Sequence, residues 1–244
     1  MRTIFIADIH GCYTELRLLL KKVQFSVKRD KLVVLGDLMD RGPDSFEVWD
    51  YLINLKKAYP DKVELIWGNH ELMLYEAYIY NRDFRYIQTW MRNGSEFTNR
   101  SFKKHGVNTY KEVAKDLEEL FAACGYTEEL CVSHAGIFNN DIENADFYDL
   151  VWNRKVLEGK TEYQGVQIIG HTPLKNGVLC IEWDKEGKPY VAKVEYEKRR
   201  KLPKRAIFDI DTGCVFGGSL TAMCVYSNNE YKLFKVDKNN QENS

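Results

Sequence analysis

Short runs of aliphatic residues alternate with amphipathic segments along the first third of the chain. The runs occupy residues 3–7, 31–35 and 63–67. After the first run, apolar side chains recur at the i, i+3, i+4, i+7 spacing of one helix face, at Leu16, Leu19, Leu20 and Val23. A second amphipathic segment follows the second run, and Asp44 is expected to cap this helix with Glu47 as its capping-box partner. Three strand–helix units in succession predict an α/β architecture.

Residues 80–128 break this pattern, because polar segments there separate aromatic residues. An amphipathic segment from about Lys111 to Cys124 predicts a helix with Gly125 as its C-cap. We interpret the insert as a small helical lid. Its aromatic residues could stack a nucleobase, but packing of a small subdomain explains most of them. These aromatic residues include Tyr78, Tyr80, Phe84, Tyr86, Trp90, Phe97 and Phe102.

The second half of the chain is rich in strand signals. Strands are expected at residues 130–133, 166–169 and 206–210. Alternating stretches separated by turn residues suggest hairpins in a second sheet; they occupy residues 178–183, 190–196, 223–226 and 231–236. The length of 244 residues and the 44% hydrophobic content allow a single domain over residues 1–244, with 80–128 as a subregion within it.

The composition of the chain indicates which kinds of binding partner are not expected. Lys and Arg (35) balance Asp and Glu (36), so the net charge of -1 gives no general attraction to nucleic acid or to an anionic membrane. The basic run Lys198–Lys201, with Lys204 and Arg205 nearby, could attract a polyphosphate but is interpreted as a solvated loop. The six cysteines show no Cys-x-x-Cys pair and are expected to be reduced. With no long apolar run and no signal peptide, a soluble cytoplasmic protein is expected.

Polar residues that can bind metal follow five of the expected strands. They are Asp8, His10, Asp37, Asn69, His134 and His171. Functional groups gather at the carboxyl ends of strands in open α/β sheets, so these side chains are expected to converge. A single histidine after a strand is more often structural, but imidazole nitrogen with carboxylate and amide oxygen is the ligand set of divalent cations. The combination predicts a centre for two cations.

The order of these motifs along the chain resembles the order found in one protein family. Asp-x-His-Gly at 8–11, Gly-Asp-x-x-Asp-Arg-Gly at 36–42, Gly-Asn-His-Glu at 68–71, His-Ala-Gly at 134–136 and Gly-His-Thr-Pro at 170–173 resemble the signature of the phosphoprotein phosphatase family of calcineurin-like metallophosphoesterases. Residues 8–13, 151–154 and 210–213 are most similar to its bacterial and phage branch, and His-Ala-Gly is also found in symmetrical diadenosine tetraphosphate hydrolases. The resemblance implies a four-layer α/β-β-α sandwich with a small helical lid.

The resemblance also implies roles for individual residues. Asp8, His10 and Asp37 would hold one cation, and Asp37, Asn69, His134 and His171 the other. His70 and Asp40 would form a proton-donating dyad. Substrate contacts are expected from Arg41 and Arg154, whose forked guanidinium groups suit phosphate oxygens, and from Asn69 and His70. Asp211 is interpreted as structural or as a support for the ligands, and His105 as an ordinary residue of the insert.

The chemistry of such a centre predicts a phosphomonoester hydrolase. Two cations can share a water, lower its pKa and clamp the attacking and departing oxygens, so the expected nucleophile is a metal-bridging hydroxide. The expected cations are Mn²⁺, with Fe, Zn, Co or Ni also compatible with these ligands. The expected substrates are proteins phosphorylated on serine, threonine or tyrosine, and the alternative is symmetrical hydrolysis of a dinucleoside tetraphosphate.

Two other classes of function are disfavoured. A nuclease or other phosphodiesterase would not need two arginines facing a terminal phosphate, and no broad basic surface is implied. A non-enzymatic scaffold would not need the intact ligand set. Stable binding to nucleic acid or membrane is therefore not expected, and the oligomeric state is left open.

Overall fold

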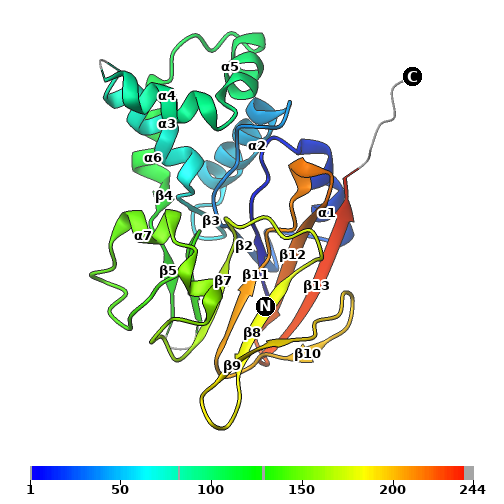
Figure 1. The fold of residues 1–244 in the computed structure, drawn as a ribbon. Coiled ribbons are helices and arrows are strands. Elements are labelled where there is room, and N and C mark those ends of the chain that lie inside the picture. The colour runs from blue at the N-terminus through cyan, green and yellow to red at the C-terminus, as the bar shows by residue number, and fades with distance from the viewer. Residues whose placement is uncertain (1, 82, 128–129, 239–244) are drawn as a thin grey trace.

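The computed structural model describes residues 2–81, 83–127 and 130–238, which form two β-sheets and seven α-helices (Figure 1). The first sheet has the strand order β10-β13-β12-β1-β2-β3-β4. Its strands are β1 (Arg2–Ile6), β2 (Asp30–Val34), β3 (Val63–Ile66), β4 (Phe121–Ala122), β10 (Arg200–Lys201), β12 (Ser219–Tyr226) and β13 (Glu230–Asp237). Strands β1 to β4 are parallel, whereas β12 pairs antiparallel with β1.

The second sheet has the order β5-β6-β7-β11-β8-β9. Its strands are β5 (Gly125–Tyr126), β6 (Leu130–Val132), β7 (Val166–Ile169), β8 (Leu179–Trp183), β9 (Pro189–Ala192) and β11 (Ala206–Asp209). Strands β6, β7 and β11 are parallel. The carboxyl ends of β6 and β7 therefore lie at one edge, as do those of β1, β2 and β3 in the first sheet.

The helices follow the parallel strands or build the insert. They are α1 (Tyr13–Lys22), α2 (Ser45–Ala58), α3 (Asn69–Ile79), α4 (Phe84–Arg92), α5 (Ser95–Lys104), α6 (Lys111–Leu120) and α7 (Phe147–Trp152), with 3-10 helices at Lys155–Glu158 and Cys214–Phe216. Helices α4 and α5 lie at the opposite end of the molecule from the β8–β9 hairpin (Figure 1). In the described parts of the chain, no helix is long and apolar enough to cross a membrane.

The hydrophobic cores define the layers. Alternate residues of the first sheet face opposite ways, because side chains alternate along a strand. Ile4 and Val34 pack in a core with Leu16 and Leu52 of the helices. Phe5, with its neighbours on the other face, packs against the second sheet in a separate core. The outer face of the second sheet packs against the segment 155–158. The order of helices, sheet, sheet and outer helical segment confirms the expected α/β sandwich.

Three local expectations were wrong. The helix expected to reach Cys124 ends at Leu120, because the next two residues join β3 as a parallel edge strand, with Leu65 paired to Phe121. The hairpin expected in the second sheet, β12–β13, belongs to the first sheet instead. Asp44 does precede α2, but its side chain accepts no capping hydrogen bond. A capping-box bond forms instead at α3, where Glu71 accepts a hydrogen bond from Gly68 N.

Candidate metal centre

Five loops at the carboxyl ends of parallel strands bring the predicted metal ligands together. Asp8 and His10 follow β1, Asp37 follows β2, and Asn69 opens α3 directly after β3. His134 and His171 follow β6 and β7 of the second sheet. All six side chains are buried. The candidate metal centre therefore lies where the edges of both sheets meet.

The backbone of these loops is held in an unusual conformation. Among the described residues other than glycine, nine have positive φ angles, and six of these belong to the candidate site. The six are Asp8, His10, Asp37, Asp40, Arg41 and His171. A non-glycine residue in this region costs on the order of 1–3 kcal/mol, and such strain is typical of functional sites. Tertiary contacts hold the loops in the conformation that brings these side chains together.

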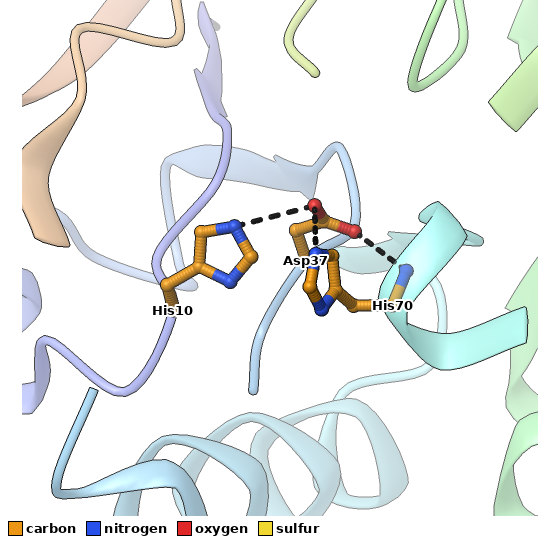
Figure 2. Close-up of side chains that lie close together, drawn as sticks. All are labelled: His10, Asp37 and His70. Carbon is orange, nitrogen blue, oxygen red and sulfur yellow. Dashed lines mark hydrogen bonds and ion pairs between the residues drawn. The ribbon is translucent and has the colours of Figure 1, made fainter. Parts of the chain in front are cut away.

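Asp37 lies at the centre of the cluster (Figure 2). Its Oδ2 is 3.3 Å from His10 Nε2, and its Oδ1 is 3.4 Å from His134 Nε2. Two groups of buried ligand atoms, each within 4.8 Å of one another, share this residue: one is His10, Asp37 and His70, and the other is Asp8, Asp37 and His134. One carboxylate common to two groups fits a residue that contacts two cations.

Backbone carbonyls orient two of the histidines. His10 Nδ1 lies 2.7 Å from Met39 O, and His134 Nδ1 lies 2.7 Å from Leu35 O. A carbonyl oxygen only accepts, so each Nδ1 carries the proton and each Nε2 presents a lone pair toward Asp37. Metal-binding histidines are held in this way by a partner on their second ring nitrogen. These two residues therefore fit a divalent cation.

Asn69 and His171 complete the cluster. Asn69 Oδ1 lies 3.0 Å from His134 Nε2 and 2.9 Å from His171 Nδ1. Because His134 Nε2 holds a lone pair, it and the Asn69 oxygen are two electron-rich atoms with no proton between them. His171 Nε2 is among the described buried atoms without a hydrogen-bond partner. These contacts fit ligands of a positive ion better than a self-contained hydrogen-bond network.

Burial keeps the imidazoles neutral. Burial, and then the neighbouring His134, lowers the pKa of His171 to about 3. Burial also lowers the pKa of His10 and of His134. Neutral imidazole is the form that binds a metal. Burial and the charges of Asp211 and Asp37 raise the pKa of Asp8 well above its ordinary value, which a nearby cation would reverse.

His70 and Asp40 form a buried pair beside Asp37. His70 Nδ1 donates to Asp40 Oδ2 at 2.7 Å, and both side chains are 0% exposed. His70 Nε2 lies 3.9 Å from Asp37 Oδ2 (Figure 2), and it has no hydrogen-bond partner among the described residues. The ring nitrogen opposite Asp40 is thus aimed at the cluster of ligands.

The two predicted arginines differ in position. Arg41 Nη1 donates to His10 Nε2 at 2.6 Å, and its guanidinium carbon lies 5.3 Å from the centre of the Phe216 ring. Arg154 is exposed, and its Nη1 donates to Thr172 Oγ1 at 2.8 Å, next to His171. Arg41 therefore reaches into the cluster, whereas Arg154 stands at its rim.

Glu71 is a supporting residue to which the sequence analysis gave no role. Its Oε2 accepts from Asp37 N at 2.7 Å and from Gly68 N at 3.0 Å, and its Oε1 accepts from Leu38 N at 2.9 Å. Burial, and then the charge of Asp37, raises the pKa of Glu71 to about 8. Its position three residues after Gly68, at the start of a helix, was the available signal. Glu71 fixes the backbone that carries Asp37.

Two further residues and the basic run lie outside the cluster of candidate ligands or beside it. Asp211 is buried, and its Oδ1 accepts from Gly213 N at 2.9 Å; burial raises its pKa to about 7. His105 pairs with Glu47 at 3.0 Å and stacks on Phe46. The basic run is partly neutralised, since Lys198 and Arg200 pair with Glu195, and Arg199 and Lys201 pair with Glu230.

The six cysteines are free thiols.

The aromatic residues of the insert divide into two sets. Trp90 and Phe102 are buried in the core between the helices and the first sheet. Phe84 is 65% exposed, and Tyr80 stacks on Tyr86 at the surface. Packing therefore accounts for the first set, and the second set remains accessible.

A buried carboxylate shared by two groups of candidate metal-binding atoms, beside two arginines, fits a metal-dependent phosphoesterase. Comparison with known families agrees. Residues 1–194 match the family described as Calcineurin-like phosphoesterase, which is more than half of the chain. The protein belongs to this family of metallophosphoesterases.

Individual relatives carry different names. A symmetrical bis(5'-nucleosyl)-tetraphosphatase of Buchnera aphidicola subsp. Acyrthosiphon pisum (strain Tuc7) is 53% identical over 74 residues, and this match spans only 30% of the chain and 26% of the relative. Serine/threonine-protein phosphatase 1 of Salmonella typhimurium is 29% identical over 232 residues, 88% of each protein. The crystal structure of a metallophosphoesterase from Sphaerobacter thermophilus superposes with a TM-score of 0.60 at 16% identity, over 98% of this chain and 89% of that one, and shows the same fold.

Proposed function

We propose that the protein hydrolyses phosphomonoesters, with proteins phosphorylated on serine or threonine, and also on tyrosine, as its substrates. The observation that carries this proposal is the buried His70–Asp40 pair aimed at the cluster around Asp37. A serine or threonine alkoxide is a strong base and a poor leaving group, so its departure needs a proton donor. A nucleoside diphosphate is a far weaker base and needs such a donor less.

The proposed ligands divide between two cations. Asp8, His10 and Asp37 hold one, and Asp37 with Asn69, His134 and His171 holds the other; Mn²⁺ is the proposed ion, and Fe, Zn, Co or Ni suit the same atoms. Bound cations supply positive charge for the phosphate oxygens and lower the pKa of a water. The orientation of His10 and His134 by backbone carbonyls supports these assignments.

The remaining residues act on the phosphate and on the leaving group. Arg41 and Arg154 bind phosphate oxygens through their forked guanidinium groups, and Asn69 lines the same position. His70 in its protonated form donates from Nε2 to the departing oxygen. Asp40 holds the opposite ring nitrogen and stabilises the imidazolium. His70 is therefore catalytic without serving as a metal ligand.

Symmetrical hydrolysis of a dinucleoside tetraphosphate is the second candidate. It is favoured by the high identity over 74 residues to a relative named for that activity. It would use the same ligands and the same arginines. Relatives matched over most of the chain carry both kinds of name: a serine/threonine-protein phosphatase over 88% of it, and a symmetrical bis(5'-nucleosyl)-tetraphosphatase over 98% of it. The preference for the first candidate therefore rests on the His70–Asp40 pair.

The two candidates are separated by one comparison. We would measure kcat/KM of the Mn²⁺-loaded protein on a phosphoserine peptide and on diadenosine tetraphosphate, with a chelated sample as the control. A preference of at least tenfold for the peptide is expected. A preference for the dinucleotide would overturn the proposed substrate, and turnover that survives chelation would overturn the metal-dependent mechanism.

A further inference from the structure

The helical insert contacts the Asp40 carboxylate directly. Trp90 of α4 donates from Nε1 to Asp40 Oδ2 at 2.9 Å, and Thr98 of α5 donates from Oγ1 to Asp40 Oδ1 at 2.5 Å. The Thr98 hydroxyl oxygen also accepts from Asp40 N at 2.9 Å. Trp90 and Thr98 are buried, so water does not compete for these bonds.

These contacts account for both oxygens of Asp40. Oδ2 is shared by His70 Nδ1 and Trp90 Nε1, and Oδ1 is held by Thr98. A carboxylate with donors on both oxygens cannot turn about its Cβ–Cγ bond without losing at least one of them. The direction in which Asp40 holds the His70 ring is therefore set by two side chains of the insert.

The insert also holds the backbone at this point. Asp40 and Arg41 both have positive φ, 68° and 66°. Arg41 N donates to Gly94 O at 3.2 Å, and Asp40 N donates to Thr98 Oγ1. A Cβ on Gly94 would lie 2.9 Å from Arg41 Cγ, so the turn between α4 and α5 packs closely on this loop. The insert thus supports a strained conformation that the loop would otherwise leave.

We propose that Trp90 and Thr98 are positioning residues for proton donation, through which the helical insert makes the site competent for basic, alkoxide-type leaving groups. This inference rests on the proposed function, because it assigns the two residues to the His70–Asp40 pair. They touch neither substrate nor ligands; they act by fixing the carboxylate that orients His70. The insert then contributes to the chemical step.

The test uses Thr98→Val and Trp90→Phe in the full chain, with kinetics on a phosphoserine peptide and on 4-nitrophenyl phosphate. For the peptide we expect kcat to fall about tenfold, a part of the roughly 10²–10⁴-fold that general acid catalysis contributes, while KM changes less than twofold. For the aryl ester, whose leaving group needs no proton, kcat should stay within twofold. Thr98→Ser, which keeps the hydroxyl, should restore the peptide rate.

A matched control lies on the same helix as Trp90. Thr89 Oγ1 donates to Arg85 O at the exposed surface. Thr89→Val should therefore leave kcat and KM unchanged for both substrates. A second readout needs no turnover: in metal-free protein with ¹⁵N-labelled histidine, the His70 Nδ1–H resonance should shift in Thr98→Val and return in Thr98→Ser. If Trp90→Phe does not fold, the Thr98 pair of variants decides the question.

Equal slowing of peptide and aryl ester in Thr98→Val, or no change in either the rates or the resonance, would overturn the positioning role. His70→Asn separates this outcome from a failure of the proposed function. If His70→Asn slows the peptide selectively and Thr98→Val does not, only the role of the insert is wrong. If His70→Asn slows both esters equally, the proton-donor assignment itself is wrong, and the inference falls with it.

Discussion

Replacing Glu71 with alanine should both destabilise the protein and weaken metal binding. Glu71 accepts hydrogen bonds from three backbone N–H groups, those of Asp37, Leu38 and Gly68, and it is 0% exposed. In Glu71→Ala these three donors lose their acceptor. The substitution therefore loosens the turn that carries Asp37 without removing any ligand.

The magnitude follows from the three donors. A buried N–H left without a partner costs about 1–3 kcal/mol, so the three together give roughly 3–9 kcal/mol. The low end applies, because burial and the charge of Asp37 already disfavour the ionised Glu71 side chain, and removing it relieves that cost. We therefore expect a loss of about 3–4 kcal/mol in the free energy of unfolding. At roughly 2–4 °C per kcal/mol for a chain of this size, Tm should fall by about 6–16 °C.

Urea denaturation of the metal-free protein measures the first effect, and titration with Mn²⁺ measures the second. Glu76→Ala, on the same helix, is the matched control, since among the described residues the Glu76 side chain accepts a hydrogen bond only from the exposed Tyr148 hydroxyl. It should change stability by less than about 1 kcal/mol. If Glu71→Ala matched this control in stability and kept wild-type metal affinity, the claim that Glu71 holds the Asp37 turn would be refuted.

Three further predictions concern separate parts of the structure. His70→Asn should keep metal content but lower kcat for a phosphoserine peptide about 100-fold, and far less for 4-nitrophenyl phosphate, since general acid catalysis contributes about 10²–10⁴-fold; steady-state kinetics with metal analysis checks this. Gly68→Ala should abolish turnover, because a Cβ there would overlap Asp37 and lie 2.7 Å from Glu71 Oε2, whereas Gly106→Ala, which meets open space, should remain active. Asp30→Asn removes a carboxylate with a lowered pKa. Burial tends to raise the pKa of Asp30, but hydrogen bonds from Arg2 and from Ser26 N hold it below its ordinary value of 3.8. Such a group stabilises the fold above the unfolded pKa and loses that effect as the pH falls through the folded one. Urea curves should thus show the Asp30→Asn deficit at pH 7 shrinking below about pH 4; a deficit independent of pH would contradict the ion pair.

The strands of the α/β units could be predicted closely from the sequence. The expected run 166–169 is β7, and 63–67 differs from β3 by one residue. Buried parallel strands are nearly continuous apolar runs, so their position depends on local composition. The position of the candidate ligands follows the same logic, because each lies within four residues of the end of such a strand.

The errors arose where partners distant in sequence decide the structure. Alternation correctly predicted β12 and β13 as a hairpin, but the hairpin was assigned to the second sheet. Its place in the first sheet depends on the pairing of β12 with β1, which sets Ile6 opposite Ala222 and which no local pattern indicates. Phe121 continues the apolar face of α6 in sequence, yet it is paired to β3 in the fold. The contacts of Trp90 and Thr98 with Asp40 could not be predicted for the same reason, because they join residues 50 and 58 positions apart.

Asp37 is shared by two groups of candidate metal ligands, and we propose that it joins them into one hydrolytic centre. The most direct measurement is elemental analysis of metal bound per chain, for the wild type and for Asp37→Asn, after loading with Mn²⁺ and removal of free ion, together with phosphatase activity of the same samples. We expect two ions in the wild type, fewer than one in Asp37→Asn, and loss of activity with the ions. Wild-type metal content and turnover in Asp37→Asn would contradict the account.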